Sequence, residues 1–124
     1  MQSITKEELD RALIDRHSYK VHQKLSNGHV AIAGLGGLGS NIAFSLARIG
    51  VGYLHLVDFD KVDITNLNRQ QYFIEHLGMY KTDALKQELL RINPYLHIRT
   101  DCVRVDETNI EAKYNWGYDP YSYN

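Results

Sequence analysis

Apolar positions along the chain fall into short runs and into longer segments with helical spacing. Residues 30–33, Val-Ala-Ile-Ala, form a run without alternation, which is typical of a strand buried on both faces. Two further runs, within YLHLVDFD (53–60) and LHIRTDCV (96–103), have the length and flanking turn residues of strands. The sequence therefore predicts three strands.

The segment that follows the first run has the repeat of an amphipathic helix. Its apolar residues recur at spacings of four, four and three, and two alanines lie beside them. These residues are Leu38, Ile42, Leu46 and Ile49, with Ala43 and Ala47. We expect this stripe to pack against the sheet, and we expect Gly50 to end the helix.

Helical patterns also begin the chain and follow the second strand. The first 25 residues are expected to be helical, with a capping box formed by Thr5 and Glu8. A later helix is predicted over residues 79–92, and an Asn-Pro pair ends it. Its inward-facing residues are expected to be Leu85, Leu89 and Ile92. Asp106 is the expected N-cap of a further helix.

The order of these elements predicts the fold class. Strands that alternate with helices favour a parallel sheet with right-handed crossovers. We therefore expect an α/β protein, the N-terminal half (α-βαβαβ) of a Rossmann-like doubly wound parallel sheet. The expected organisation is an N-terminal helix over residues 1–28, a nucleotide-binding βαβαβ unit over 29–113, and an irregular or disordered tail over 114–124. The tail holds four of the nine tyrosines, the only tryptophan and no aliphatic residue.

Composition narrows the functional classes. With 23% charged residues and a formal net charge of −1, the 124-residue chain has no electrostatic footprint for nucleic acid or for an anionic membrane. No segment reaches the roughly 20 apolar residues that span a bilayer. The N-terminus lacks the basic and apolar pattern of a signal peptide, and the single cysteine, Cys102, excludes an internal disulfide. We expect a cytoplasmic protein in which Cys102 is a buried strand residue without a chemical role.

The stretch GLGGLGSN (34–41) places a Gly-x-Gly-x-x-Gly between the first strand and the following helix. Gly34 allows a tight turn, Gly36 allows a phosphate to approach the backbone, and Gly39 allows close helix–strand packing. The free N–H groups and positive dipole end of the helix favour an anion. Asp58 follows Gly39 by 19 residues at the end of the second strand, where a carboxylate reaches a ribose hydroxyl. These features predict a site for NAD, FAD or ATP, and Asp58 argues against NADP.

The loop after the second strand favours ATP among these nucleotides. It holds Asn66, Arg69 and Gln70 within five positions. Lys81 begins the next helix, twelve residues after Arg69. Two cations at one mouth of the sheet neutralise a triphosphate and the charge that develops during transfer at phosphorus, whereas hydride transfer has no use for them. Two alternatives stay open: an NAD(H)-binding oxidoreductase domain, and a non-catalytic nucleotide-binding or dimerisation module.

Three stretches of the sequence resemble one family. GLGGLGSN, LVDFDKVDITNLNRQ and GMYKTDAL, in this order, are similar to the adenylyltransferases of the ThiF and MoeB type, relatives of the ubiquitin-activating enzymes. GLGGLGSNIAFSLARIG together with NLNRQQYF is similar to the shorter ThiF-like proteins linked to thiamine biosynthesis. The resemblance implies an enzyme that binds ATP and Mg²⁺ together with a small ubiquitin-like sulfur carrier protein (ThiS-like), and that adenylates the carrier's C-terminal carboxylate.

The resemblance also implies roles for individual residues. The phosphate loop would be formed by Gly36, Gly37 and Gly39. Asp58 would hold the ribose, and Asp60 would lie near the nucleotide. The residues around the triphosphate would be Asn66, Arg69, Gln70 and Lys81. Arg69 and Lys81 would stabilise the transition state, and Arg16 would be donated across a homodimer.

Part of the family's pattern lies outside this sequence. The aspartate that holds magnesium in the family lies on a later strand, so we assign no metal ligand. We expect the chain to be the N-terminal part of an adenylyltransferase, folded but without turnover of its own. We also expect a homodimer, because half a sheet leaves an apolar edge to cover.

Overall fold

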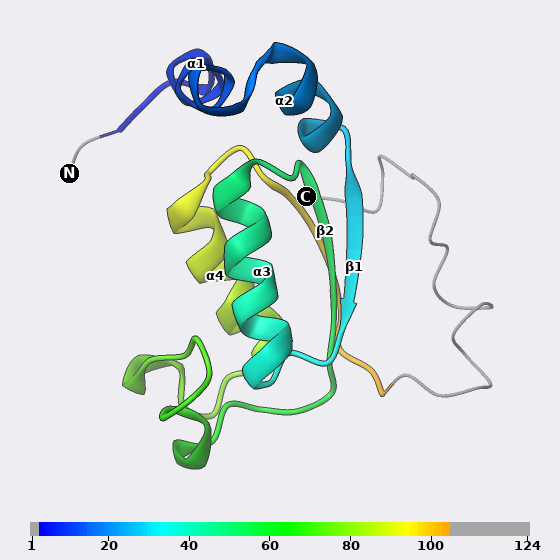
Figure 1. Cartoon of the computed structure of the whole chain (residues 1–124). Helices are drawn as coiled ribbons and strands as arrows, with labels where there is room; N and C mark the ends of the chain where they lie inside the picture. The colour runs from blue at the N-terminus through cyan, green and yellow to red at the C-terminus, as the bar shows by residue number, and fades with distance from the viewer. Residues whose placement is uncertain (1–2, 105–124) are drawn as a thin grey trace.

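A three-stranded parallel sheet forms the centre of the computed structural model, which describes residues 3–104 (Figure 1). Its strands are β1 (His29–Ala33), β2 (Tyr53–Val57) and β3 (His97–Asp101), in the order β1-β2-β3. Tyr53 pairs with both His29 and His97, so the three strands start at the same level. This arrangement is the N-terminal half of a Rossmann-like doubly wound sheet, and the predicted fold class is confirmed.

Two helices cover one face of the sheet (Figure 1). They are α3 (Gly37–Ile49), between β1 and β2, and α4 (Lys81–Ile92), between β2 and β3. The connection from β2 to α4 contains two short 3-10 helices, η1 (Ile64–Asn66) and η2 (Ile74–His76). Gly50 ends α3 in the left-handed conformation (φ 101°), as the sequence predicts. No helix within residues 3–104 has the length and apolarity to cross a membrane.

The N-terminal region forms two helices in place of the single helix expected over residues 1–28. They are α1 (Lys6–His17) and α2 (Tyr19–Ser26). Between them Ser18 has a positive φ of 117°. Its amide donates to the carbonyl of Ile14 at the end of α1, and its hydroxyl oxygen caps the first turn of α2. The expected capping box of Thr5 and Glu8 opens α1.

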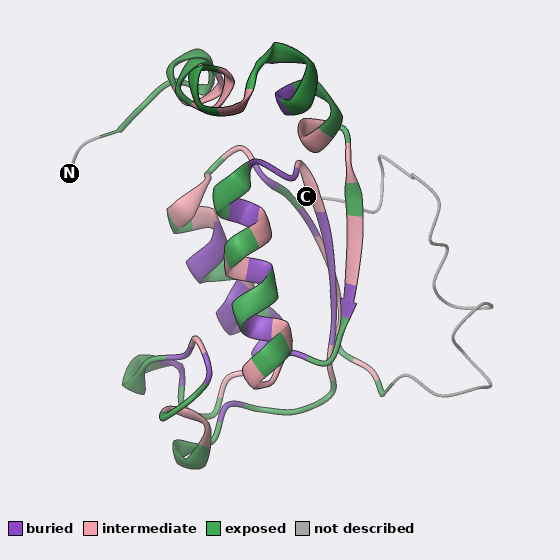
Figure 2. Ribbon diagram, viewed as in Figure 1, coloured by how far each residue is buried: buried purple, intermediate pink, exposed green. Residues whose placement is uncertain are grey.

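The hydrophobic core lies between the sheet and its two covering helices (Figure 2). On α4, Leu85 and Leu89 are fully buried as predicted, and Ile92 packs partly against the core. From the sheet, Leu54 and Ile98 point into the same core. Burial of these side chains is the main force that holds α4 on the sheet.

The buried face of α3 matches the predicted stripe only at its two alanines, Ala43 and Ala47. Its buried residues are Ser40, Ala43 and Ala47. Of the predicted apolar stripe, Leu38, Ile42 and Ile49 are exposed, Leu38 by 78%, and only Leu46 packs partly against the core. The physical reason is distance, because a helix that approaches the sheet closely has room only for small side chains at the contact.

Other expectations fail at the edges of the sheet. β3 ends at Asp101, so Cys102 lies just beyond the strand and is exposed rather than buried. β1, expected to be buried on both faces, buries only Ile32, because β1 is an edge strand of the described sheet. The helix expected at Asp106 and the tail over 114–124 lie outside the described residues.

The face of the sheet opposite the core carries polar and aromatic side chains. The rings of His29 and His97 stack on either side of Tyr53, with centroids 4.2 and 4.6 Å from it. Two residues further along β2, His55 Nε2 lies 2.6 Å from Asp101 Oδ2, and His55 is only 2% exposed. Burial lowers the pKa of His55, and the bond to Asp101 opposes this effect only in part.

We predict that His55 makes the stability of the fold depend on pH. Because its folded-state pKa lies below the ordinary value of 6.5, the unfolded chain binds more protons as the pH falls through that value, and the free energy of unfolding decreases. Urea denaturation at about pH 7.5 and about pH 5.5 measures the loss. In His55→Gln, which does not titrate, the loss should be smaller. An equal loss of stability in both proteins would show that the pH dependence comes from groups other than His55.

A second prediction concerns Gly39, where α3 crosses the end of β1. A Cβ atom at this position would lie 1.8 Å from the carbonyl oxygen of Gly34, a backbone atom that cannot move alone. Gly39→Ala should therefore lower the free energy of unfolding by about 2–3 kcal/mol. Gly37→Ala is the matched control, because the nearest atom to its Cβ would be 3.6 Å away. Thermal denaturation that finds the two variants equally stable would contradict the close packing.

Candidate nucleotide-binding site

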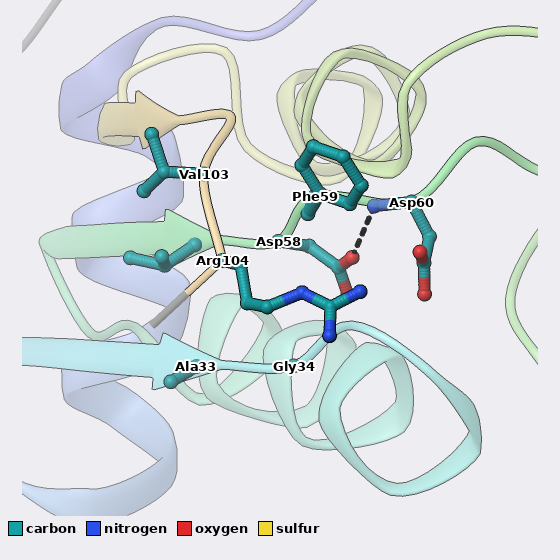
Figure 3. Close-up of a pocket in the computed structure, with 8 residues that line it drawn as sticks. Ala33, Gly34, Asp58, Phe59, Asp60, Val103 and Arg104 are labelled. Atoms are coloured by element: carbon teal, nitrogen blue, oxygen red, sulfur yellow. Dashed lines mark hydrogen bonds between the residues drawn. The ribbon is translucent and has the colours of Figure 1, made fainter. Parts of the chain in front are cut away.

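A cavity of about 620 Å³ opens at the carboxyl ends of β1 and β2 (Figure 3). It is lined by Ala33, Gly34, Val57, Asp58, Phe59, Asp60, Val103 and Arg104. In a doubly wound sheet, ligands bind at the carboxyl ends of the strands, next to the place where the strand order reverses. Three residues predicted from the sequence line the cavity directly, namely Gly34, Asp58 and Asp60.

The glycine loop turns from β1 into α3 beside this cavity. Gly34 has a φ of 95°, a conformation that residues with a side chain rarely adopt, and its amide donates to the Val57 carbonyl (2.8 Å). Gly36 is the N-cap of α3, and it makes no side-chain cap hydrogen bond. The first amides of α3 therefore lack intrahelical partners, and with the helix dipole they favour an anion such as a phosphate.

The carboxylate of Asp58 holds the backbone around the cavity. Its Oδ2 accepts from the amide of Leu35 (2.6 Å), and its Oδ1 accepts from the amide of Asp60 (2.7 Å). Figure 3 shows the second of these bonds, with the carboxylate facing the cavity. Each carboxylate oxygen has a further lone pair, so Asp58 can also accept hydrogen bonds from ribose hydroxyls.

Two side chains that sequence reasoning missed lie in the cavity beside Asp58. The guanidinium carbon of Arg104 is 5.5 Å from the centroid of the Phe59 ring, a cation–π distance, and Phe59 is 52% exposed. An exposed aromatic ring and a guanidinium plane are surfaces on which a nucleobase stacks. The only signal in the sequence was that both residues follow the ends of strands, and such ends meet at one edge of a parallel sheet.

A second group of predicted residues lies against the glycine loop itself. A Cβ on Gly37 would meet the carbonyl oxygen and side-chain stem of Arg69, and a Cβ on Gly36 would come within 3.7 Å of Gln70 Nε2. Gln70 is only 8% exposed. The structure thus brings Arg69 and Gln70 beside the glycines that the sequence predicts to bind phosphate, across some 30 residues of sequence.

The loop that carries Arg69 is held by hydrogen bonds within the loop and by a hydrogen bond to the glycine loop. Asn66 accepts hydrogen bonds on its carbonyl from the amides of Arg69 and Gln70, and its side-chain oxygen accepts from the amide of Asp63 (2.8 Å). Asn66 therefore shapes the loop. The hydroxyl of the buried Tyr72 donates to the carbonyl of Leu35 (2.6 Å), and burial raises the pKa of Tyr72, which keeps the proton in place.

The backbone of Lys81, the first residue of α4, is bonded to Asp60, which lines the cavity. Its amide donates to the Asp60 carbonyl (2.9 Å), and the whole residue is only 6% exposed. Among residues 3–104, its ammonium has no hydrogen-bond or ion-pair partner within the distances that define such contacts. The ammonium is not one of the fully buried polar atoms that lack a partner, so it keeps contact with solvent and can pair with an anion there.

Arg16 lies far from the other predicted residues within one chain. It is exposed on α1, and α1 packs at the amino ends of the strands, where Gly50 contacts Leu13 and His22 (Figure 1). The glycine loop lies at the carboxyl ends. The described chain therefore does not bring its own Arg16 to the site.

One cluster of side chains has the composition of a metal site, but its hydrogen bonds give it a structural role. Ligand atoms of Glu75, His76 and Glu88 lie within 4.8 Å of one another. The amide of Phe73 donates to His76 Nδ1 (2.8 Å), so the ring proton is on Nε2, which donates to Glu88 Oε1 (3.1 Å). Arg91 also contacts Glu88 (3.0 Å). Both ring nitrogens are used, and the cluster connects η2 to α4.

The fold and the geometry of this site are those of the first half of a doubly wound α/β protein. A model of the ThiF family matches residues 9–119, and the chain belongs to that family. The family resemblance of the sequence is confirmed.

Relatives share sequence with most of this chain. The tRNA threonylcarbamoyladenosine dehydratase of Bacillus subtilis is 40% identical over 98 residues, which are 78% of this chain and 39% of that protein. The adenylyltransferase and sulfurtransferase UBA4 of Scheffersomyces stipitis is 37% identical over 93 residues, or 74% of this chain and 21% of that protein. The chain therefore spans well under half the length of these relatives.

Solved structures of other proteins also resemble this chain over most of its length. The tRNA N6-threonylcarbamoyladenosine dehydratase TcdA of Escherichia coli, in complex with ATP, superposes with a TM-score of 0.81 at 27% identity, covering 90% of this chain and 47% of that one. Escherichia coli MccB with ATP gives a TM-score of 0.71 at 34% identity, covering 75% of this chain and 28% of that one.

We predict that the Asp58 carboxylate is needed for the loop geometry even without nucleotide. In Asp58→Asn the new NH₂ group would face a backbone N–H, because both carboxylate oxygens accept from amides. The free energy of unfolding should fall by about 1–3 kcal/mol in urea denaturation. Asp63→Asn is the matched control, since Asp63 accepts from the Thr65 amide with one oxygen that an asparagine retains. Equal stability of the two variants would contradict this role of Asp58.

Proposed function

We propose that this chain binds Mg·ATP and forms part of an enzyme that activates a carboxylate by adenylation. Lys81 is the observation that carries the proposal, because its largely buried side chain ends in an ammonium that has no ion-pair partner among the described residues. Arg69 against Gly37 supplies a second cation next to the free amides of α3. A dinucleotide needs no such pair of cations, whereas the triphosphate of ATP carries the charge that matches them.

The cavity suits the nucleoside end of the ligand. Asp58 would accept from the ribose hydroxyls, and Phe59 with Arg104 would bound the base. The phosphates would then run along the glycine loop toward Arg69 and Lys81. Magnesium would arrive with the triphosphate, whose oxygens it prefers, and would neutralise part of its charge. The exposed carboxylate of Asp60 is an oxygen donor of the type that fits this ion, and we assign no complete ligand set.

The reaction would be an in-line displacement at phosphorus. An oxygen of the substrate carboxylate attacks the α-phosphorus, the bond to the bridging oxygen of the β-phosphate breaks, and pyrophosphate leaves with that electron pair. Arg69 and Lys81 would stabilise the negative charge that develops on the phosphate oxygens. The chain's own residues supply position and charge, and no covalent intermediate with the protein is required.

The substrate we propose is the C-terminal carboxylate of a small ubiquitin-like sulfur carrier protein, as in thiamine biosynthesis with a ThiS-like carrier. The similarity to UBA4, named an adenylyltransferase and sulfurtransferase, supports this choice. Arg16 would reach the site only from a second copy, because its own chain holds it at the opposite end of the strands. We therefore propose a homodimer in which each copy donates Arg16 to the other.

A second candidate substrate is a carboxylate attached to tRNA. The similarity to the tRNA threonylcarbamoyladenosine dehydratases, at 40% identity for the Bacillus subtilis protein, favours it. Exchange of labelled pyrophosphate into ATP separates the two substrates, because the exchange needs the matching acid. Exchange that starts only with a carrier protein ending in Gly-Gly would support the first, and exchange that starts only with tRNA would replace it by the second.

We predict that the chain binds Mg·ATP in preference to NAD and that Arg69→Ala weakens ATP binding. Loss of a charge-assisted contact to phosphate should raise the Kd about tenfold or more. Arg48→Ala is the matched control, since Arg48 is an exposed cation in the last turn of α3, away from the site. Isothermal titration calorimetry with each nucleotide gives the values.

The other outcomes of this titration would contradict the proposal in different ways. Tighter binding of NAD than of ATP would replace it by the oxidoreductase domain. An unchanged Kd for ATP in Arg69→Ala would remove Arg69 from the site. Binding of neither nucleotide would overturn the claim that the described residues suffice to hold one.

A further inference from the structure

Asn41, at the start of the second turn of α3, connects the helix with the loop that carries Arg69. Its Oδ1 accepts from Gln71 Nε2 (2.5 Å). Its Nδ2 donates to the Gly37 carbonyl (2.5 Å) and also faces the Arg69 carbonyl at 3.4 Å. One side-chain amide thus uses its oxygen and both N–H groups, and it reaches 28 residues along the sequence to do so.

The neighbouring residue makes the same connection from the buried side. Ser40 is fully buried, and its hydroxyl oxygen accepts from the backbone amide of Gln71 (3.2 Å). We call Ser40, Asn41 and Gln71 the α3 clamp. Through the α3 clamp, both the backbone and the side chain of Gln71 are bonded to the start of the helix whose amides face the phosphate site.

The α3 clamp acts directly on the backbone of Arg69. On one side of Arg69, Asn66 accepts from its amide, and on the other side Asn41 donates to its carbonyl. The side-chain stem of Arg69 lies along Gly37, and its Nη1 is 3.4 Å from the carbonyl of Thr65. The starting point and the direction of the arginine side chain are therefore set relative to the glycine loop before any ligand arrives.

Helix stability does not explain an asparagine at this position. Asparagine is less favourable than alanine inside a helix, and a side chain that bonds back to the carbonyl four residues earlier tends to weaken it. Asn41 is also exposed, so it adds little to the core. An aspartate would set its carboxylate against two carbonyl oxygens, and an apolar residue would make none of the bonds. The chemistry of the position requires a group that donates twice and accepts once.

We propose that Asn41 is a positioning residue, which holds Arg69 in place for the phosphates through the α3 clamp. The inference rests on the proposed function for its ligand, a nucleoside triphosphate. The geometry of the α3 clamp is a property of the free protein and does not depend on the proposed function. The consequence is a fixed spacing between the two phosphate-binding groups, the amides of α3 and the guanidinium of Arg69.

The first test uses the free protein and therefore needs no ligand. Amide hydrogen exchange by NMR should show that Asn41→Ala speeds exchange of the Gln71 amide several-fold, because half of its connection to α3 is lost. Ser45→Ala, an exposed change in the next turn of the same helix, is the matched control and should leave exchange at Gln71 unchanged. Unchanged exchange in Asn41→Ala would overturn the proposal.

The second test asks whether Asn41 acts through Arg69. Asn41→Ala should raise the Kd for Mg·ATP about fivefold, the effect of one hydrogen bond, and leave the Kd for adenosine, which has no phosphate, unchanged. In an Arg69→Ala background the same change should have no further effect. An equal effect in both backgrounds, or an equal effect on adenosine, would overturn the positioning role.

The two tests separate this inference from the proposed function. If Arg69→Ala does not weaken Mg·ATP binding, the proposed role of Arg69 fails, while the exchange rate at Gln71 still decides whether Asn41 holds the loop. If Arg69→Ala weakens binding and Asn41→Ala does not, the proposed function stands and the positioning role of Asn41 is overturned.

Discussion

The close contact between Gly39 and the carbonyl of Gly34 is the constraint on which the rest of the site depends. Because no side chain stands between them, α3 begins directly over the end of β1. This contact places the free amides of the helix beside the cavity, and it leaves room only for Ala43 and Ala47 where the helix meets the sheet. The same closeness forces Leu38 outward, to 78% exposure. A binding feature and a packing feature therefore have one geometric cause.

How far the sequence predicts this protein depends on the range of each interaction. The strands, Gly50 and the glycine loop follow from local spacing, and the structure confirms them. The predicted face of α3 was right at Ala43 and Ala47 but wrong at Leu38, Ile42 and Ile49, because periodicity counts apolar residues and cannot give the distance between helix and sheet. Phe59 and Arg104 were missed because they are 45 residues apart and meet only through the topology of the sheet. The break at Ser18 was missed because a serine can end one helix and cap the next without a glycine or proline to signal it.

Charge is distributed unevenly around the site. One of the two aspartates that line the cavity, Asp58, is already bonded to two backbone amides and so serves as an acceptor within the fold. The basic groups are less engaged. The ammonium of Lys81 keeps contact with solvent and has no ion-pair partner among the described residues, and Arg69 makes only a long contact, 3.4 Å, to a carbonyl. These two cations are matched to an anion, whereas the exposed carboxylate of Asp60, which also lines the cavity, is matched to a cation.

The loop from Asn66 to Tyr72 makes this arrangement rigid in advance. Tyr72 bonds to Leu35 beneath the glycine loop, Gln70 packs on Gly36, and Gln71 bonds to the first turn of α3. Groups that stabilise developing charge are effective when they need not move during the reaction, because reorganisation would consume the stabilisation they provide. The physical meaning of these contacts is therefore that two segments, one before β2 and one after it, form a single surface that is preorganised for the phosphate site we propose. The cavity that we propose for the nucleoside is lined by the residues at the ends of the strands, so it is built from a different part of the chain.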